Sequence, residues 1–244
     1  MRIGILETGD VAAEMKARFG DYPAMNRALL APVMPEAEFF SVPLIEGAHP
    51  ERPEQADGWI VTGSRHGVYD DLPWIGPLRD FLRDARRQGV PVAGICFGHQ
   101  ILAEALGGKA ELSDRGWAVG LERYRVTARP GWMQPWQDHF AGLAMHRDQV
   151  TALAPDASLL AAGANCPFAA LAYGDPEAPD AISVQTHPEF TPDFLRELII
   201  FRRGTVVPEE VADRALASLD AAPDNALWAE WLAGFFRRRR SGGR

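Results

Sequence analysis

Short apolar runs alternate with helical patterns along the first half of the chain. The apolar residues of segment 75–85 recur at helical spacing, and Gly89 and Pro91 end that segment. Four runs read as strands, at residues 2–6, 38–42, 59–62 and 92–95. Such alternation is typical of a mostly parallel central sheet flanked by helices, an α/β fold.

Further helices are predicted within residues 11–30 and over 99–106, and Pro192 is placed in the first turn of a helix that reaches about residue 203. The middle of the chain is poorer in helical periodicity. We expect a short mixed or antiparallel β region there, followed by a last strand over 181–186. Its strand candidates are residues 121–126, 158–162 and 169–173.

The last forty or so residues look like an all-helical addition. We therefore predict one domain over residues 1–205 and a C-terminal helical extension, 206–244, packed on it. Within the extension an apolar stripe recurs at helical spacing, and it either packs on the chain's own domain or forms a dimer or partner surface. The stripe consists of Leu227, Trp228, Trp231, Leu232, Phe235 and Phe236.

The charge balance and the cysteine count exclude several classes of protein. Lys and Arg number 25 against 33 Asp and Glu, a net charge of -8, so a nucleic-acid partner is not expected. The one basic cluster, Arg237 to Arg240, is either a solvated helix end or a contact for a partner or anion.

No apolar stretch is long enough to span a membrane, and the N-terminus lacks the charged, apolar and small-residue regions of a signal peptide in order, so we expect a cytoplasmic protein. Two cysteines are too few for a disulfide scaffold or a cysteine-rich zinc site.

One of these cysteines stands between glycines where a predicted strand turns into a helix. The segment is GICFGHQ, residues 94–100, with Cys96 at the turn. Such a nucleophile elbow leaves no room for flanking side chains, which explains the glycines. The helix start points free N–H groups at the sulfur, and they favour the thiolate and are placed to hold an oxyanion. Cys166 lacks this setting and is interpreted as a packing residue.

A thiol nucleophile needs a base, and the base needs an orienting acceptor. His187 directly follows a predicted strand, in the segment QTHPEF, residues 185–190. If that strand lies beside the one ending at Cys96, both carboxyl ends reach the same edge of the sheet, and thiol and imidazole meet. Glu189 is then the acceptor for the second imidazole nitrogen. The other histidines show no metal-ligand spacing; we interpret them as structural or surface residues, namely His49, His66, His99 and His139.

In these two motifs the chain resembles the class I glutamine amidotransferases, whose pattern is Gly-x-Cys-x-Gly-x-Gln followed much later by His-Pro-Glu. The resemblance extends over about residues 2–203 and implies the flavodoxin-like fold of that family. Within the family, the chain looks most similar to the glutaminase domain of GMP synthetase. The segment HRDQV, residues 146–150, also resembles a His-x-Asp-x-Val segment of that domain. A loop braced by local hydrogen bonds is the other interpretation of HRDQV.

The resemblance implies a role for each matching residue, and it implies no metal or organic cofactor. Cys96 is the nucleophile, His187 the base and then the acid, and Glu189 its orienting partner. The backbone amides of Gly63 and Phe97 form the oxyanion hole, a role that a glycine at a strand end also suits on physical grounds. Two residues complete the substrate-binding set. They are Gln100, which either contacts the amino-acid end of the substrate or serves the fold, and Ser64, which begins the loop 64–71.

Three functions stay open at this point. The first is hydrolysis of the glutamine side-chain amide, with the ammonia passing to a separate synthetase subunit or to no acceptor. The second is γ-glutamyl peptide hydrolysis, as in similar stand-alone peptidases that cleave glutathione. The third, from another class, is a binding or regulatory protein that keeps the fold. The sequence holds no phosphate-binding loop of the Gly-x-x-x-x-Gly-Lys type, which a synthetase would use to activate the molecule that accepts the ammonia. The expected partners are therefore a small-molecule substrate and either a synthetase subunit or further copies of the chain.

Overall fold

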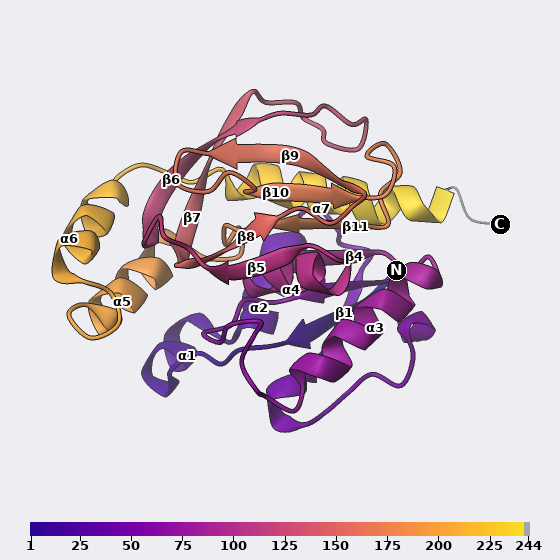
Figure 1. Cartoon of the computed structure of the whole chain (residues 1–244), viewed down its shortest axis with the longest axis horizontal. Coiled ribbons are helices and arrows are strands. Elements are labelled where there is room, and N and C mark those ends of the chain that lie inside the picture. Colours follow the sequence, from indigo (N-terminus) through magenta and orange to yellow (C-terminus); the bar gives the residue numbers. More distant parts are fainter. Residues whose placement is uncertain (242–244) are drawn as a thin grey trace.

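A large mixed sheet runs through the molecule, and helices cover both of its faces (Figure 1). The computed structural model describes residues 1–241, with side chains up to residue 238. The elements, with short 3-10 helices labelled η, are β1 (Arg2–Glu7), α1 (Ala13–Phe19), α2 (Tyr22–Leu30), β2 (Glu38–Pro43), η1 (Leu44–Glu46), η2 (Pro53–Gln55), β3 (Gly58–Val61), α3 (Ile75–Arg87), β4 (Val92–Ile95), α4 (Phe97–Ala105), β5 (Lys109–Leu112), β6 (Ala118–Val126), β7 (His139–His146), β8 (Asp148–Ala152), β9 (Ala157–Gly163), β10 (Ala170–Tyr173), β11 (Ala181–Val184), α5 (Pro192–Arg202), α6 (Glu209–Ser218) and α7 (Asn225–Ser241).

Within the described residues the main sheet has nine strands, in the order β2-β1-β3-β4-β11-β10-β9-β6-β7. Neighbouring strands from β2 to β11 are parallel, and those from β11 to β7 are antiparallel. The predicted α/β class is confirmed, but the antiparallel part is longer than the short region that we expected. Strands β5 and β8 pair in a separate two-stranded sheet.

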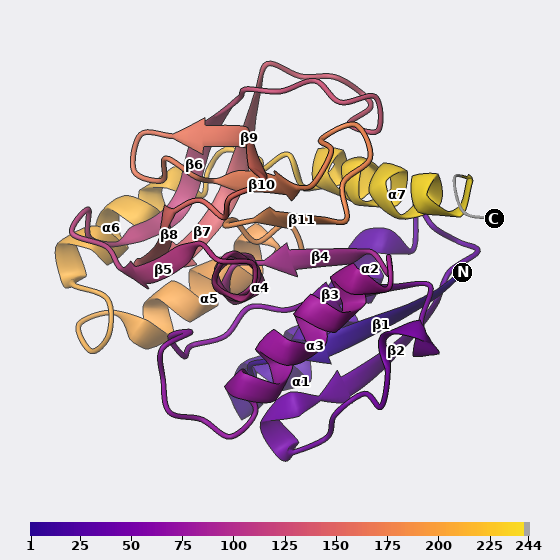
Figure 2. The same cartoon turned by 45° about the vertical axis from the view of Figure 1, so that its right-hand side comes forward.

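Two apolar cores lie on opposite faces of the parallel strands. On one face Ile3, Ile5 and Ile60 pack with residues of α2 and α7. On the other face Trp59 and Val61 pack with residues of α3 and α4. Figure 2 shows α3 crossing in front of β1 and β3. Because successive residues of a strand point to opposite faces, a strand buried on both faces reads as a continuous apolar run, as β3 and β4 do in the sequence.

The structure differs from the sequence prediction in two places. The helix expected within 11–30 is two helices, because Gly20 adopts a φ of +81° and the Asp21 side chain caps a new helix by accepting from Ala24 N at 2.8 Å. Three strands were not predicted, namely β5, β7 and β8. Strand β7 is buried over nearly its whole length and rich in alanine and glycine, so it shows neither alternation nor β propensity.

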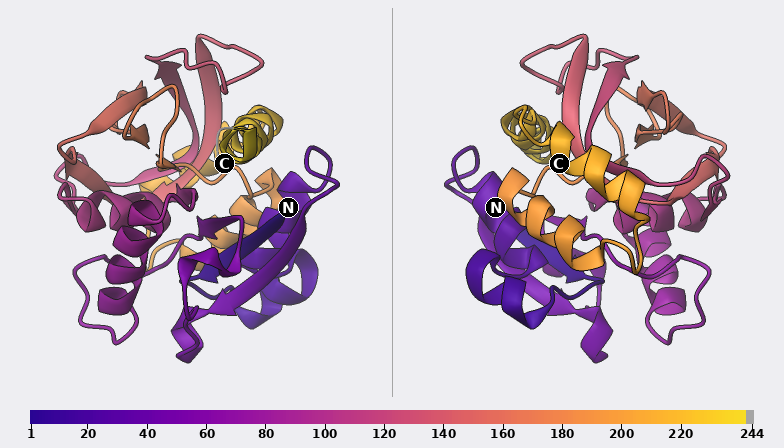
Figure 3. Two further views of the ribbon diagram at one scale, coloured as in Figure 1. Left: turned by 90° about the vertical axis from the view of Figure 1, so that its right-hand side faces the viewer. Right: turned by 90° about the vertical axis from the view of Figure 1, so that its left-hand side faces the viewer.

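Helices α6 and α7 follow residue 205, and the division of the chain at that point stays a prediction. The apolar stripe of α7 is buried within this chain, with Trp228, Trp231 and Phe236 each at most 1% exposed. Figure 3 shows α7 ending on the same side as the N-terminus, where Arg237 forms an ion pair with Glu36 at 2.9 Å. The side chains of Arg239 and Arg240, and residues 242–244, lie outside the described part of the chain. No helix among residues 1–241 is both long and apolar enough to cross a membrane.

Candidate active site

Cys96 occupies the turn between β4 and α4 in a strained conformation. Its φ is +53°, the one positive value among the non-glycine residues that the structure describes. A Cβ atom on Gly94 would overlap the carbonyl oxygen of Gly98, and one on Gly98 would overlap that of Val61. Only glycine permits this close approach of α4 to the sheet. The elbow predicted from the sequence is therefore present, with Cys96 4% exposed.

His187 reaches Cys96 because their strands are neighbours. Strand β11 pairs in parallel with β4, with Val184 opposite Ile95, so the residues that follow both strands meet at one edge of the sheet. The His187 backbone N–H donates to Leu143 O at 2.8 Å, and the imidazole lies close enough to Cys96 that the negative charge of Cys96 raises the imidazole pKa. The expectation that thiol and imidazole meet agrees with this geometry.

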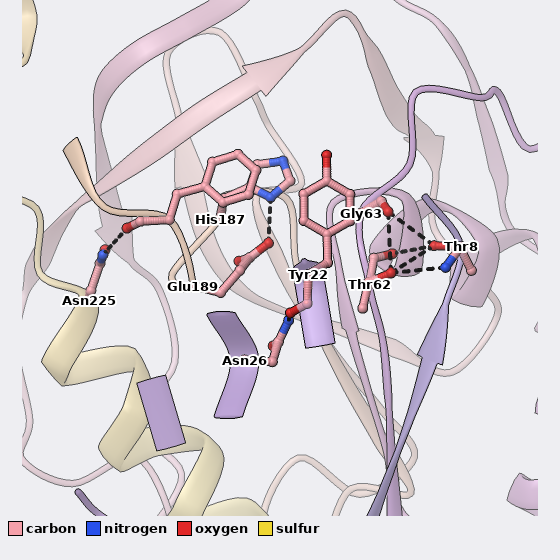
Figure 4. Close-up of polar contacts among 9 residues, drawn as sticks. Thr8, Tyr22, Asn26, Thr62, Gly63, His187, Glu189 and Asn225 are labelled. Carbon is pink, nitrogen blue, oxygen red and sulfur yellow. Dashed lines mark hydrogen bonds and ion pairs between the residues drawn. The ribbon is translucent and has the colours of Figure 1, made fainter. Parts of the chain in front are cut away.

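Glu189 faces the other side of the imidazole. Its Oε1 lies 2.8 Å from His187 Nδ1 (Figure 4), and its side chain is fully buried. Burial alone would lower the pKa of His187, but the negative charges of Cys96 and Glu189 and hydrogen bonds to both outweigh it and raise that pKa to about 10. The electrostatic environment of His187 thus favours its protonated form, the imidazolium.

The His187 ring is held between two surfaces. A Cβ on Gly63 would lie 2.7 Å from His187 Cε1 and 3.7 Å from Cys96 Cβ, so this glycine rests directly against both residues. The second surface is the Phe190 ring, which is stacked on the imidazole, and the Asn225 side chain at the start of α7 donates to the Phe190 carbonyl at 2.6 Å. The sequence carried no signal for Phe190 or Asn225, because neither belongs to a chemical motif.

Two backbone amides next to Cys96 have no acceptor among the described residues. Phe97 is the first residue of α4, where helical N–H groups lack intrahelical partners. The Gly63 amide follows the end of β3 and likewise donates to no described group. The structure therefore places both residues of the predicted oxyanion hole beside the thiol.

A pocket of about 90 Å³ opens at Cys96, and Ser64 and Gln100 are among its lining residues. Gln100 Nε2 donates to Asp148 O at 2.8 Å and to Gln185 Oε1 at 3.2 Å, so the side chain holds the start of β8 against α4. The other lining residues are Arg65, His66, Trp117, Met145, His146, Arg147, Asp148 and Arg202. No sequence motif pointed to Trp117, Met145 or Arg202.

The HRDQV segment forms one wall of this pocket. His146 ends β7 and Asp148 begins β8, and His146 Nδ1 lies 3.1 Å from Asp148 O. Across the pocket mouth, Tyr69 of the loop 64–71 donates to Asp148 Oδ2 at 2.9 Å. Local hydrogen bonds thus brace the segment, and the segment also borders the nucleophile.

Among the remaining histidines, His99 is fully buried, its Nδ1 lying 2.7 Å from Ser183 Oγ. Burial and the neighbouring His146 lower the pKa of His99 to about 3. The pKa of His146 is also lowered to about 3, mainly by burial. His66 Nδ1 lies 3.3 Å from Asp70 Oδ2 in the loop 64–71. No group of three or more potential metal-binding side chains occurs among the described residues.

A second, larger pocket of about 660 Å³ adjoins the first. Arg65, His66 and Arg202 line both. The larger pocket lies beyond the carboxyl ends of β1 and β3 and is closed on one side by α5, where Phe194, Leu198 and Phe201 line it. The pocket at Cys96 therefore borders a space much larger than a water molecule or ammonia needs.

Known proteins resemble this chain in sequence and in fold. Gamma-glutamyl peptidase 3 of Arabidopsis thaliana is 28% identical over 204 residues, which are 80% of this chain and 80% of that protein. A glutamine-hydrolyzing GMP synthase of Aromatoleum aromaticum is 34% identical over 141 residues, which are 55% of this chain but 26% of the synthase. The structure of a glutamine amidotransferase from Thermotoga maritima superposes with a TM-score of 0.76, and the match covers 98% of this chain and 97% of that one. The two sequences are 17% identical, so this match shows a likeness in fold alone. A glutamine amidotransferase class-I family model matches residues 42–205, more than half of the sequence, and the chain therefore belongs to the class I glutamine amidotransferase family.

Proposed function

We propose that the protein hydrolyses the side-chain amide of glutamine, or the equivalent bond of a γ-glutamyl compound, with Cys96 as the nucleophile. The observation that carries this proposal is the arrangement of Cys96 in a strained elbow beside a His187 that packs against the same glycine, Gly63, and that Glu189 orients at 2.8 Å. Nucleophile, base and orienting acceptor in this order are what acyl transfer requires.

The first half of the reaction forms a thioester. The Cys96 thiolate attacks the carboxamide carbon, and the carbonyl electrons move to oxygen, which the Gly63 and Phe97 amides stabilise. As the C–N bond breaks, the His187 imidazolium gives its proton to the leaving nitrogen. The products of this half are the glutamyl thioester and ammonia or an amine.

The second half consumes one water molecule. Neutral His187 takes a proton from the water, whose oxygen attacks the thioester carbon at the same oxyanion site. The C–S bond then breaks, glutamate leaves, and the thiolate–imidazolium pair is restored. In this scheme Ser64 and Gln100 shape the pocket that receives the glutamyl group, and Gln100 acts by holding the Asp148 carbonyl in place.

One observation favours the second candidate, a γ-glutamyl peptide substrate. Arg65 and Arg202 stand where the two pockets meet, and among the described residues neither guanidinium group has an ion-pair or hydrogen-bond partner. Unpaired guanidinium groups attract carboxylates. A leaving group larger than ammonia, such as a peptide with a free carboxylate, suits the larger pocket that these arginines border.

An assay panel decides between the candidates. Ammonia release from glutamine is measured beside glutamate release from γ-glutamyl dipeptides and glutathione, each with a Cys96→Ala variant. We expect turnover of at least one substrate and a loss of at least about 1,000-fold in Cys96→Ala. Turnover that survives this substitution would refute the assigned nucleophile, and silence on every substrate would favour a binding protein or a subunit that needs its synthetase.

The peptide candidate has its own test. Arg202→Met should raise KM for a γ-glutamyl dipeptide, leave KM for the same dipeptide with an amidated C-terminus unchanged, and leave glutamine hydrolysis unchanged. Arg196→Met is the matched control, since Arg196 lies on the same helix α5 and only approaches Asp220, at 3.9 Å, on the surface. Equal effects of Arg202→Met on all three substrates would argue against a carboxylate contact.

A further inference from the structure

Thr8, just beyond the end of β1, makes a buried hydrogen-bond network with the residues that follow β3. Its hydroxyl donates to Thr62 O at 2.9 Å and lies 3.2 Å from Gly63 O, and its backbone N–H donates to Thr62 Oγ1 at 3.0 Å. Both threonine side chains are fully buried, and Figure 4 shows their contacts with each other and with Gly63. A Cβ on Gly9 would lie 2.7 Å from Gly63 O, so the backbone after Thr8 also rests against this carbonyl.

These bonds determine the direction of the Gly63 amide. In a trans peptide the C=O of Thr62 and the N–H of Gly63 point in opposite directions. Strand β3 lies between β1 and β4, and Cys96 follows β4. A Thr62 carbonyl held toward Thr8, on the β1 side, therefore points the Gly63 N–H toward Cys96.

We propose that Thr8 is a positioning residue, whose hydroxyl holds the Thr62–Gly63 peptide so that the Gly63 N–H points at the developing oxyanion. The inference rests on the proposed function, because it gives that amide a role in acyl transfer. A preorganised donor stabilises charge without having to reorient during the reaction, and a freely rotating peptide would lose part of this benefit. The Thr8 bonds to two successive carbonyls remove that freedom.

The test compares Thr8→Val, which keeps the shape but removes the hydroxyl, with Thr8→Ser, which keeps the hydroxyl. On whichever glutamine or γ-glutamyl substrate the wild type turns over, we expect kcat to fall about 10-fold in Thr8→Val with KM unchanged. Thr8→Ser should retain the wild-type kcat. Thr127→Val is the control for loss of a threonine-to-carbonyl bond elsewhere, since Thr127 Oγ1 donates to Leu159 O at 2.8 Å far from the site.

Two further readouts separate positioning from a loss of structure. Binding of a γ-aldehyde analogue of glutamine, whose thiohemiacetal places an oxyanion at the same point, should weaken by the same factor as kcat. Alkylation of Cys96 by iodoacetamide creates no oxyanion and should keep its wild-type rate. If Thr8→Val does not fold, Thr8→Ala takes its place in all three measurements.

Each outcome is decisive. A wild-type kcat in a folded variant without the Thr8 hydroxyl, or an equal slowing of alkylation, would overturn the positioning role while leaving the proposed function intact. A wild type that turns over none of the substrates would argue against turnover by this chain alone, on which both the proposed function and the role of Thr8 rest.

Discussion

The imidazole of His187 lies flat against the ring of Phe190, with ring centroids 3.9 Å apart and planes inclined by 8°. Phe190 is in turn stacked on Tyr22 and packed edge-on against Phe194. The ring that orients the proposed base is thus anchored by residues from α2 and α5. A nearly parallel stack leaves the imidazole free to slide but not to tilt, so Phe190 and the His187–Glu189 hydrogen bond together define its position.

Loss of this stack should impair turnover more than it impairs stability. Phe190→Leu keeps an apolar side chain of similar volume, and we expect it to cost about 1 kcal/mol in the free energy of unfolding. We expect kcat to fall about 10-fold because the imidazole is less well oriented. The measurements are steady-state kinetics and denaturant unfolding.

Phe140→Leu is the matched control for Phe190→Leu. Phe140 is stacked on Tyr124, with centroids 5.0 Å apart, in the aromatic core next to α7, and it lines neither the pocket at Cys96 nor the larger pocket beside it. The Phe140→Leu variant should lose about as much free energy of unfolding as Phe190→Leu does, and it should keep the wild-type kcat. Equal losses of kcat in both variants would show that general softening of the core, and not the stack, is responsible.

A methyl group at residue 63 should disable the site. In Gly63→Ala the new Cβ would lie 2.7 Å from His187 Cε1, so the imidazole must move away from Cys96. We expect kcat/KM to fall by about 100-fold or more while the protein stays folded. Gly76→Ala in α3 is the control, because its Cβ would meet no atom within 4 Å; it should keep full activity and gain about 0.5–1 kcal/mol of stability. An active Gly63→Ala enzyme would contradict the close packing seen here.

His187 should remain protonated well above neutral pH. Its pKa, raised to about 10, exceeds the ordinary value of 6.5, so the folded state binds this proton more tightly than the unfolded state does. The resulting stabilisation is complete below about pH 6.5 and is lost as the pH rises toward about 10. The NMR signal of the labelled imidazole, followed against pH, measures the titration directly.

The cause of this shift can be tested with the two cysteines. Burial lowers the pKa of His187, and Cys96 is the main group that raises it, so Cys96→Ala should move the titration to lower pH. Cys166→Ala should leave it in place, since Cys166 is not among the groups that act on His187. An unchanged titration in Cys96→Ala would argue against a thiolate–imidazolium pair.

The buried His99 should make the protein sensitive to acid. Because its pKa is lowered to about 3, the folded state stays unprotonated where the unfolded chain, with a pKa near 6.5, binds a proton. Stability is therefore lost as the pH falls below about 6.5, by about 2 kcal/mol between pH 7 and pH 5 for this one group. Urea unfolding of wild type and His99→Gln at both pH values measures the difference. A variant that loses as much stability as the wild type would contradict the prediction.

Much of the site could be predicted from local sequence. The glycines around Cys96 identify a turn that few other sequences could adopt, since Cβ atoms at 94 and 98 would overlap backbone oxygens. Parallel strands end at a common edge, so a strand ending at residue 95 and another ending near His187 were enough to predict that the two side chains meet. The roles of Cys96, His187 and Glu189 in turnover stay predictions until the variants are assayed.

Only the tertiary structure decided what surrounds these groups. Strand β7 escaped prediction because a strand buried over nearly its whole length carries no periodic pattern, yet it supplies the carbonyl that anchors the His187 backbone. Arg202 and Thr8 come from a helix end and from just beyond a strand end, in segments far from Cys96 in the chain. Their proximity to Cys96 follows from how the sheet pairs and the helices pack, and such long-range contacts leave no mark on local sequence. Sequence thus predicted the proposed reacting groups through short-range sterics, whereas folding determined their alignment and the space open to a substrate.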